Sequence, residues 1–382
     1  MADRHLELGV FAPTIGCLPP QGRSSFMLVS GAEQRTEPTF DYNRRVAEML
    51  DRAGFEVFFM AQRGRGFGPS DFWGTSLDSI TSAAALAMVT KQIKIVSTVH
   101  TAFLHPGVLA RMGATLDQIT NGRWGLNLVS GWTHKDFHML NIPFLGHDER
   151  YQQTAEFVEV LEKFWTIDWF DYHGKHFTIQ QGICNPKPTH LPPLYNAGSS
   201  PAGKDFTARY CDWYFTGAVT PQQVKAEIAD VRARAAKHGR DVRFITYVFV
   251  LCRETEAQAE KEADEILSLG DFTAAQELIE GLTGQTIGTA ASIMGHGVTP
   301  EQMLAAVVLG VGSAKLIGTP KQVALKLSQL QEAGIDAVGL TFRHVEEEMA
   351  NFIEKVLPLL EDMGIRQRRA RKVVPISRAA GQ

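Results

Sequence analysis

Strand-like and helix-like segments alternate along most of this chain, and that alternation is the strongest constraint on its fold. Eight apolar segments have the length and pattern of buried strands, and each is followed by a segment with helical periodicity. The strand-like segments are residues 6–13, 57–61, 93–98, 124–129, 194–197, 213–216, 244–251 and 337–342. Eight strands that alternate with helices are typical of a closed parallel barrel. We therefore predict a TIM (β/α)8 barrel, with residues 1–382 forming a single domain.

A doubly wound open sheet is the main structural alternative, but no GxGxxG motif follows the first strand, and a Rossmann arrangement is disfavoured. Two segments depart from the regular repeat: a long loop at residues 14–39 and an insertion at residues 271–312. Because long loops in compact domains often serve as lids or binding loops, we expect both to modify a site at the carboxyl face of the barrel. The basic tail, residues 363–382, is expected to pack on a neighbouring subunit.

The composition excludes several classes of protein. The formal net charge of -4 gives no reason to expect nucleic acid as a partner. No apolar run approaches the roughly 20 residues that a membrane helix needs, and the first residues lack the apolar core of a signal peptide. Cys17, Cys184, Cys211 and Cys252 have no CxxC spacing, which argues against a disulfide frame or a zinc site. The chain is interpreted as a cytoplasmic protein with reduced thiols.

The fourth predicted strand carries polar side chains at its carboxyl end, where (β/α)8 barrels build their active sites. Asn127 lies within this strand and Ser130 directly after it, with Asp136 a short distance further on. No nucleophile elbow, HExxH motif or P-loop occurs. His134 and His138 have the i, i+4 spacing of metal ligands on a helix, but a polar surface face is the favoured interpretation, and no metal is expected. A chain with so few reactive groups often relies on a cofactor for the difficult chemical step.

Residues 197–201 form a candidate anion site, because they follow a predicted strand and begin a helix with Pro201. Backbone N–H groups and the helix dipole can hold a phosphate there, and Ser200 adds a hydroxyl group. Arg150 and Tyr151 add a cation and a phenol that can face a phosphate.

Motifs spread over roughly residues 6–362 resemble those of the bacterial-luciferase-like flavin monooxygenases, a two-component family. The segments at 65–68, 72–73, 110–112 and 127–132 are similar to the branch that acts on pyrimidines such as uracil. The segments at 33–36, 41–44, 147–151, 198–200, 212–216 and 317–320 are similar to the branch that acts on dimethyl sulfone. The resemblance is weakest in the 271–312 insertion.

The resemblance implies a barrel that binds FMN at the carboxyl ends of its strands. It also implies that a separate NAD(P)H-dependent flavin reductase supplies the FMN in reduced form. Carried over by position, the cofactor-binding residues are Gln62, Arg63, Asn127, Asp136, Arg150, Tyr151 and Ser200. The last three are expected at the phosphate and the others at the flavin ring. Thr98 and Asn127 are implied as the catalytic pair, whose polar pocket positions dioxygen against the flavin.

Four aromatic residues are predicted to form a wall of the substrate pocket: Phe72, Trp73, Phe103 and Trp132. Thr98 follows the pyrimidine branch, whereas Gln62 and Arg63 replace an apolar–Lys pair there and Asp136 replaces a longer carboxylate. We predict a monooxygenase of uracil-like N-heterocyclic amides that cleaves a C–N bond. The alternatives are a monooxygenase of dimethyl sulfone or other small organosulfur compounds with C–S cleavage, a deazaflavin-dependent reductase, and a non-catalytic flavin-binding relative. A homodimer or homotetramer is expected, with the reductase, O2 and a small molecule as partners and neither nucleic acid nor membrane.

Overall fold

Eight parallel strands close into a barrel in the computed structural model, which describes residues 5–16, 28–69, 71–294 and 299–367. The barrel strands, in the order in which they pair, are β1 (Glu7–Phe11), β3 (Val57–Phe59), β5 (Lys94–His100), β6 (Trp124–Val129), β9 (Leu194–Asn196), β10 (Trp213–Phe215), β11 (Arg243–Cys252) and β13 (Ala337–Thr341). Pairing of β13 with β1 closes the ring. The predicted (β/α)8 barrel is therefore confirmed.

Aromatic side chains fill the barrel lumen. Successive residues of a strand point to opposite sides, so every second residue of each strand faces inward. The lumen contains Phe11, Phe59, Tyr195, Trp213, Phe215 and Tyr247. Tyr195 stacks on Trp213 with ring centroids 5.3 Å apart, and Phe11 stacks on Tyr247 at 4.9 Å. Because this core leaves no open channel, a ligand can enter only where the strands end.

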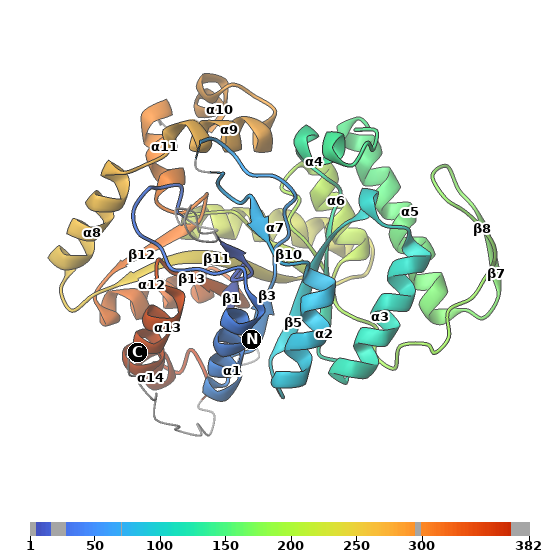
Figure 1. Ribbon diagram of the computed structural model, residues 1–382, viewed down its shortest axis with the longest axis horizontal. Coiled ribbons are helices and arrows are strands. Elements are labelled where there is room, and N and C mark those ends of the chain that lie inside the picture. Colours follow the sequence, from blue (N-terminus) through green and yellow to red (C-terminus); the bar gives the residue numbers. More distant parts are fainter. Residues whose placement is uncertain (1–4, 17–27, 70, 295–298, 368–382) are drawn as a thin grey trace.

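Helices surround the barrel (Figure 1). The helices that follow successive barrel strands are α1 (Phe40–Ala53), α2 (Ser79–Val89), α3 (Pro106–Thr120), α5 (His147–Thr166), α6 (Pro201–Tyr210), α7 (Pro221–Ala236), α8 (Glu256–Ser268) and α13 (Val345–Lys355). The chain adds α12 (Pro320–Glu332) before β13 and α14 (Leu357–Asp362) after α13. Local sequence sets their ends: Gly54 ends α1 in the left-handed conformation, and Thr220 with Gln223 forms a capping box at the start of α7. No helix in the described ranges combines the length and the apolar character needed to cross a membrane.

The insertion at residues 271–312 is helical. It contains α9 (Phe272–Thr283), α10 (Ile287–Met294) and α11 (Pro300–Val308), which lie together at the top of the molecule in Figure 1. A further strand, β12 (Ala314–Gly318), follows and pairs with the second half of β11, Val248–Cys252. The smaller elements are the antiparallel pairs β2 (Ile15–Gly16) with β4 (Thr75–Ser76) and β7 (Phe170–His173) with β8 (Thr178–Gly182), the short helix α4 (His134–Met139) and the 3-10 turn η1 (Thr101–Phe103).

The described parts of the first loop and of the basic tail both pack on the barrel. Arg343 donates from Nε to the backbone carbonyl of Glu33, and this bond ties the 28–39 segment to the end of β13. In the tail, the Arg366 guanidinium lies 3.1 Å from the Glu56 carboxylate and over the ring of Phe55. The start of the tail thus contacts its own chain. Most of the tail that is predicted to contact a neighbouring subunit, residues 368–382, lies outside the described residues. Cys17 also lies outside them.

Candidate functional site

A cavity of about 1220 Å³ opens at the carboxyl ends of β6 and β9. Its walls are formed by residues 128–135, at and after the end of β6, by the start of α5, and by residues 196–200, which precede α6. Glu277 and residues 280–285 of the insertion close one side. Lys135 Nζ and Glu277 Oε2 are 2.7 Å apart, so an ion pair joins α4 to α9 beside the cavity. The volume exceeds that of a typical small-molecule site and suits a cofactor together with a small substrate.

Arg150 supplies a cation to the cavity wall. It is 8 % exposed and donates from Nε to the carbonyl of Gly131 at 3.0 Å and from Nη1 to that of Leu145 at 2.5 Å. Its guanidinium lies 4.1 Å from the ring centroid of Phe144. These contacts fix the side chain and leave Nη2 without a hydrogen bond to any described residue. Burial lowers the pKa of Arg150, but a guanidinium keeps its positive charge in proteins.

Tyr151 and Ser200 lie beside Arg150 in the same wall. Burial raises the pKa of Tyr151, and its hydrogen bond with Ser200 opposes that shift. Ser200 caps α6 by accepting from the backbone N–H of Gly203 at 3.1 Å. A Cβ at Gly198 would lie 2.3 Å from the Tyr151 hydroxyl, so only glycine permits this close approach. The structure therefore brings together the three predicted phosphate ligands at the N-terminus of a ten-residue helix.

Thr98 and Asn127 are neighbours on β5 and β6, in direct register. Asn127 Nδ2 donates to Thr98 Oγ1 at 3.1 Å, and Thr98 Oγ1 donates to the carbonyl of Met60 at 2.7 Å. Both side chains are buried. Because the threonine proton is used by Met60, Thr98 acts as an acceptor towards Asn127. The second Nδ2 hydrogen and Oδ1 of Asn127 are the groups of this pair that remain for a ligand.

A buried ion pair lies under an aromatic enclosure at the mouth of the barrel. Arg63 Nη1 and Asp136 Oδ2 are 2.8 Å apart, and both side chains are almost fully buried. The guanidinium lies 4.6 Å from the ring centroid of Trp132, 5.0 Å from that of Phe67 and 5.9 Å from that of Trp73. Burial lowers the pKa of Arg63 to about 10 and raises that of Asp136, so desolvation opposes the attraction between the charges.

The predicted aromatic wall is only partly assembled. Phe72 stacks on Trp73 at 4.9 Å, and Trp73 meets Trp132 edge to face at 6.2 Å. Trp73 has φ +68, a backbone conformation that bulky residues rarely adopt and that marks a constrained loop. Phe103 does not join this group, because it packs on Phe137 instead. Phe67 completes the enclosure, and the 65–68 motif was the sequence signal that could have identified it.

Gln62 faces the start of α2 rather than the ion pair. Its Oε1 accepts from the Ser79 hydroxyl at 2.9 Å, and Ser79 also contacts the backbone carbonyl of Thr98 at 2.7 Å. Gln62 therefore links the ends of β3, α2 and β5.

His100 is a buried polar residue at the mouth that the sequence interpretation missed. It ends β5, two residues after Thr98, and stacks on Phe103 with ring centroids 5.0 Å apart and planes within 4°. Burial lowers the pKa of His100 to about 4, and the charge of Arg63 adds to this shift. The ring is therefore neutral near pH 7. The two-residue spacing from Thr98 was the sequence signal, because it places both side chains on one face of the strand.

In the part of the chain that the structure describes, the other histidines and the acidic groups do not gather into a metal centre. His134 and His138 have ring centroids 6.0 Å apart, and His134 packs against Phe144. Within the described ranges, no cluster of three or more His, Cys, Asp or Glu side chains is placed to hold a metal ion.

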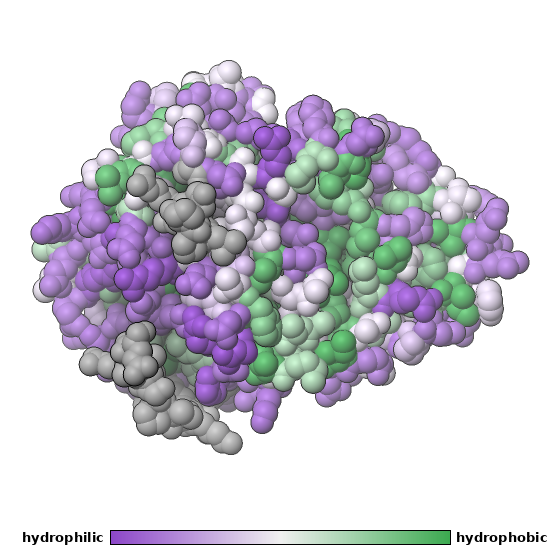
Figure 2. Space-filling view, viewed as in Figure 1, coloured by the Kyte–Doolittle hydropathy of each residue, from purple (hydrophilic) through white to green (hydrophobic). Residues whose placement is uncertain are grey.

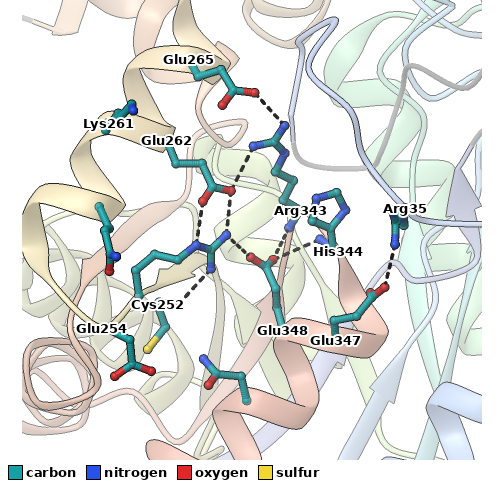
Figure 3. Close-up of a pocket in the computed structure, with 13 residues that line it drawn as sticks. Arg35, Cys252, Glu254, Lys261, Glu262, Glu265, Arg343, His344, Glu347 and Glu348 are labelled. Atoms are coloured by element: carbon teal, nitrogen blue, oxygen red, sulfur yellow. Dashed lines mark hydrogen bonds and ion pairs between the residues drawn. The ribbon is translucent and has the colours of Figure 1, made fainter. Parts of the chain in front are cut away.

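A second cavity, of about 820 Å³, lies between α8, α13 and the 28–39 segment (Figure 3). Its charged groups pair with one another. Arg343 donates to Glu262 and Glu265 at 3.0 Å, and Arg253 donates to Glu262 and Glu348. Every guanidinium nitrogen of Arg343 is hydrogen-bonded, and its bond to the carbonyl of Glu33 holds the first loop against the end of β13.

Comparisons with known proteins agree on one family. Residues 23–337 match the family model described as luciferase-like monooxygenase. An FMNH2-dependent dimethylsulfone monooxygenase from Pseudomonas putida is 34% identical over 353 residues, 91% of this chain and 95% of that protein. A pyrimidine monooxygenase from Variovorax paradoxus is 31% identical over 359 residues, 91% of this chain and 94% of that protein. The crystal structure of DmoA from Hyphomicrobium sulfonivorans superposes with a TM-score of 0.81 at 21% identity, covering 95% of this chain and 89% of that one.

Replacement of His100 by Phe should change the pH dependence of stability. The pKa of His100 is about 4 in the folded chain and about 6.5 in the unfolded chain, so the unfolded chain binds more protons between these values. The contribution of neutral His100 is complete above pH ~6.5 and falls by about 3 kcal/mol as the pH drops to ~4. In chemical denaturation across this range, the stability of wild type relative to His100→Phe should fall by about 3 kcal/mol as the pH drops. Curves that stay parallel would contradict the buried neutral imidazole.

Proposed function

Because the chain belongs to the luciferase-like monooxygenase family, we propose that it is a two-component monooxygenase that uses reduced FMN and O2. The observation that carries this proposal is the cavity above β6 and β9. That cavity is lined by Arg150, Tyr151 and Ser200, and by Leu128 and Val129, which directly follow Asn127 on β6. A separate NAD(P)H-dependent reductase would supply the reduced flavin. Because that reductase uses NAD(P)H, we propose a cytoplasmic location.

The residues present fit FMN. A phosphate needs cations and hydrogen-bond donors, and the wall offers the free Nη2 of Arg150, two hydroxyl groups and the N-terminus of α6. The apolar part of a flavin needs flat apolar surface, which Trp132 and Phe67 provide on the other side of the cavity. Nε of Arg63, a buried polar atom without a partner among the described residues, is a further group that the flavin heterocycle could satisfy.

Reduced FMN would supply the two electrons with which one oxygen atom of O2 enters the product and the other becomes water. Asn127 contributes the Nδ2 hydrogen that Thr98 does not use, as a fixed donor for negative charge that develops on oxygen. Thr98 is a positioning residue, because its bonds to Met60 and Asn127 orient the amide. Residues of the insertion line the cavity together with Phe67 and Trp132 of the aromatic enclosure, and with ligands bound they would limit the access of water to the mouth.

The proposed substrate is a uracil-like N-heterocyclic amide, cleaved at a C–N bond. Thr98 follows the pyrimidine branch, and the aromatic surface of Trp132 and Trp73 suits a planar ring. The second candidate is dimethyl sulfone or another small organosulfur compound. Sequence identity favours this second candidate, because the related dimethylsulfone monooxygenases are 34% identical to the chain and the related pyrimidine monooxygenases are 29–32% identical.

A homodimer or homotetramer is also proposed. Apolar side chains gather over α2 and α3 in Figure 2, and Met88 is 75 % exposed there, with Val108 and Met112 exposed on α3. Apolar patches of this kind mark contact surfaces in many proteins.

Aerobic turnover with a generic flavin reductase, NADH and FMN under labelled dioxygen tests the proposed function. Uracil and dimethyl sulfone are offered separately, and products are analysed by mass spectrometry. A labelled ring-opened product from uracil is expected. A labelled sulfinate from dimethyl sulfone would select the second candidate. Absence of oxygen consumption above the reductase background would contradict a monooxygenase.

Thr98→Val should lower kcat for substrate oxygenation about 100-fold, because Asn127 loses the acceptor that orients it. The dissociation constant of reduced FMN should stay within about threefold, since Thr98 lies away from the phosphate wall. Thr98→Ser keeps the hydroxyl and should restore most of kcat. Thr101→Val, which removes a buried hydroxyl three residues further on, is the matched control. Equal losses in Thr98→Val and Thr101→Val would contradict a specific role.

Arg150→Met should weaken the binding of reduced FMN by about 10- to 100-fold. This is the range expected for loss of a charged hydrogen bond to phosphate. Reduced riboflavin has no phosphate, so its affinity should change little. Anaerobic fluorescence titration of both ligands measures the difference. Arg44→Met, which removes an arginine paired with acids on α1, is the control. A parallel loss for both ligands in Arg150→Met would mean that Arg150 supports the fold and not the phosphate.

A further inference from the structure

Three buried acceptor atoms at the mouth of the barrel have no hydrogen-bond partner in the described part of the chain. One, Oδ1 of Asp136, belongs to the ion pair with Arg63, and the two on uncharged side chains are Nδ1 of His100 and Oδ1 of Asn127. The two residues are only 8 % and 5 % exposed. Buried polar atoms are nearly always hydrogen-bonded, because an unpaired one loses the free energy of hydration without compensation. Two such atoms on neighbouring strands therefore indicate a ligand that supplies their partners.

The hydrogen-bond network fixes the chemical character of the Asn127 atom. Thr98 Oγ1 gives its only proton to the carbonyl of Met60, at 2.7 Å. Its remaining capacity is as an acceptor, so the Asn127 amide must turn its NH2 group towards Thr98, where the separation is 3.1 Å. The opposite orientation would place two acceptors against each other. Oδ1 is therefore the unpaired atom, and it can only accept.

The unpaired nitrogen of His100 is also an acceptor. Burial keeps the imidazole neutral, with a pKa of about 4, and the backbone of Gln62 provides its one hydrogen bond. A backbone carbonyl takes the ring N–H, so the other nitrogen carries a lone pair. That nitrogen is Nδ1, the unpaired atom. Stacking on Phe103 with planes within 4° holds the ring in this orientation.

Strand register brings the two acceptors together. Asn127 is in register with Thr98, and His100 is two residues further along β5. Because a strand has a period of two, Thr98 and His100 lie on the same face, and His100 occupies the diagonal position from Asn127. Both are at the carboxyl end of the barrel, where residues 128 and 129 already line the cavity.

We propose that His100 Nδ1 and Asn127 Oδ1 accept hydrogen bonds from N–H groups of the substrate and so select planar heterocycles that carry N–H donors. The inference rests on the proposed function and names the substrate class of the same site. A cyclic amide satisfies the two acceptors. A sulfone carries only acceptor oxygens and would leave both buried atoms unpaired, and sites built to pair a polar group discriminate strongly against ligands that lack the partner.

The test compares uracil with 1,3-dimethyluracil, which has the same ring and no N–H group. Binding of each to the protein with reduced FMN is measured anaerobically by calorimetry, for wild type and two variants. Wild type should bind uracil at least tenfold more tightly. His100→Phe keeps the stacked ring and removes the nitrogens, and it should lower this preference about tenfold. His100→Asn can return an acceptor near the position of Nδ1 and should keep most of the preference for uracil.

The outcomes separate the inference from the function on which it rests. If wild type binds uracil and His100→Phe keeps the full preference over 1,3-dimethyluracil, the inference is wrong while the proposed function stands. If His100→Phe instead weakens the binding of reduced FMN tenfold and leaves the preference for uracil unchanged, the N–H group that pairs with His100 belongs to the cofactor, and the inference is also wrong. If wild type binds neither pyrimidine, the pyrimidine function and the inference fail together. The wild-type preference needs no variant, so a folding defect in His100→Phe leaves the test intact.

Discussion

The parallel register between β5 and β6 determines where the polar chemistry of this barrel lies. It sets Thr98 opposite Asn127 and, by the two-residue period of a strand, turns His100 to the same face. Ser97 points the other way, where it bonds the carbonyl of Ser79 and receives the indole N–H of Trp124. A slip of one residue would exchange the two faces and move the polar groups out of the mouth. The outward bonds of Ser97 therefore help to hold Thr98 and His100 on the inner face of β5.

Burial then determines what these groups can do. The lumen below them is packed with aromatic rings, residues of the insertion line the cavity above, and Thr98, His100 and Asn127 are themselves buried, so bulk water has little access to their hydrogen bonds. In such surroundings charges must be paired, and Arg63 and Asp136 meet this condition at 2.8 Å inside an aromatic enclosure. Neutral groups need partners as well. Thr98 and Met60 satisfy one side of Asn127, and the other side is left for whatever binds.

The fold was largely predictable from local pattern. The strand predicted at residues 124–129 has those bounds in the structure, and the residues proposed for the phosphate do lie together. These features depend on short-range signals: apolar runs, a proline that begins α6, and a serine that caps it. The short strand β12 gave no such signal, because it is short, carries Lys315 at its second position and pairs only with the second half of β11.

Contacts across elements were less predictable, because they depend on register and on loop conformation. Phe103 was placed with the other aromatic residues, yet the turn η1 sets it against His100. Phe67 and Trp73 meet because a loop with a left-handed Trp73 folds back over Arg63. His100 itself was overlooked because its importance lies in a missing partner, and only the three-dimensional packing reveals that.

The most direct test of a flavin site at this barrel mouth is the crystal structure of the anaerobic complex with reduced FMN. The phosphate is expected within hydrogen-bonding distance of Arg150, Tyr151 and Ser200, with the flavin ring over the carboxyl end of β6. A phosphate bound elsewhere, for example at the arginine cluster around Arg343, would contradict the assignment. So would a cavity that stays without flavin at concentrations where the protein turns over.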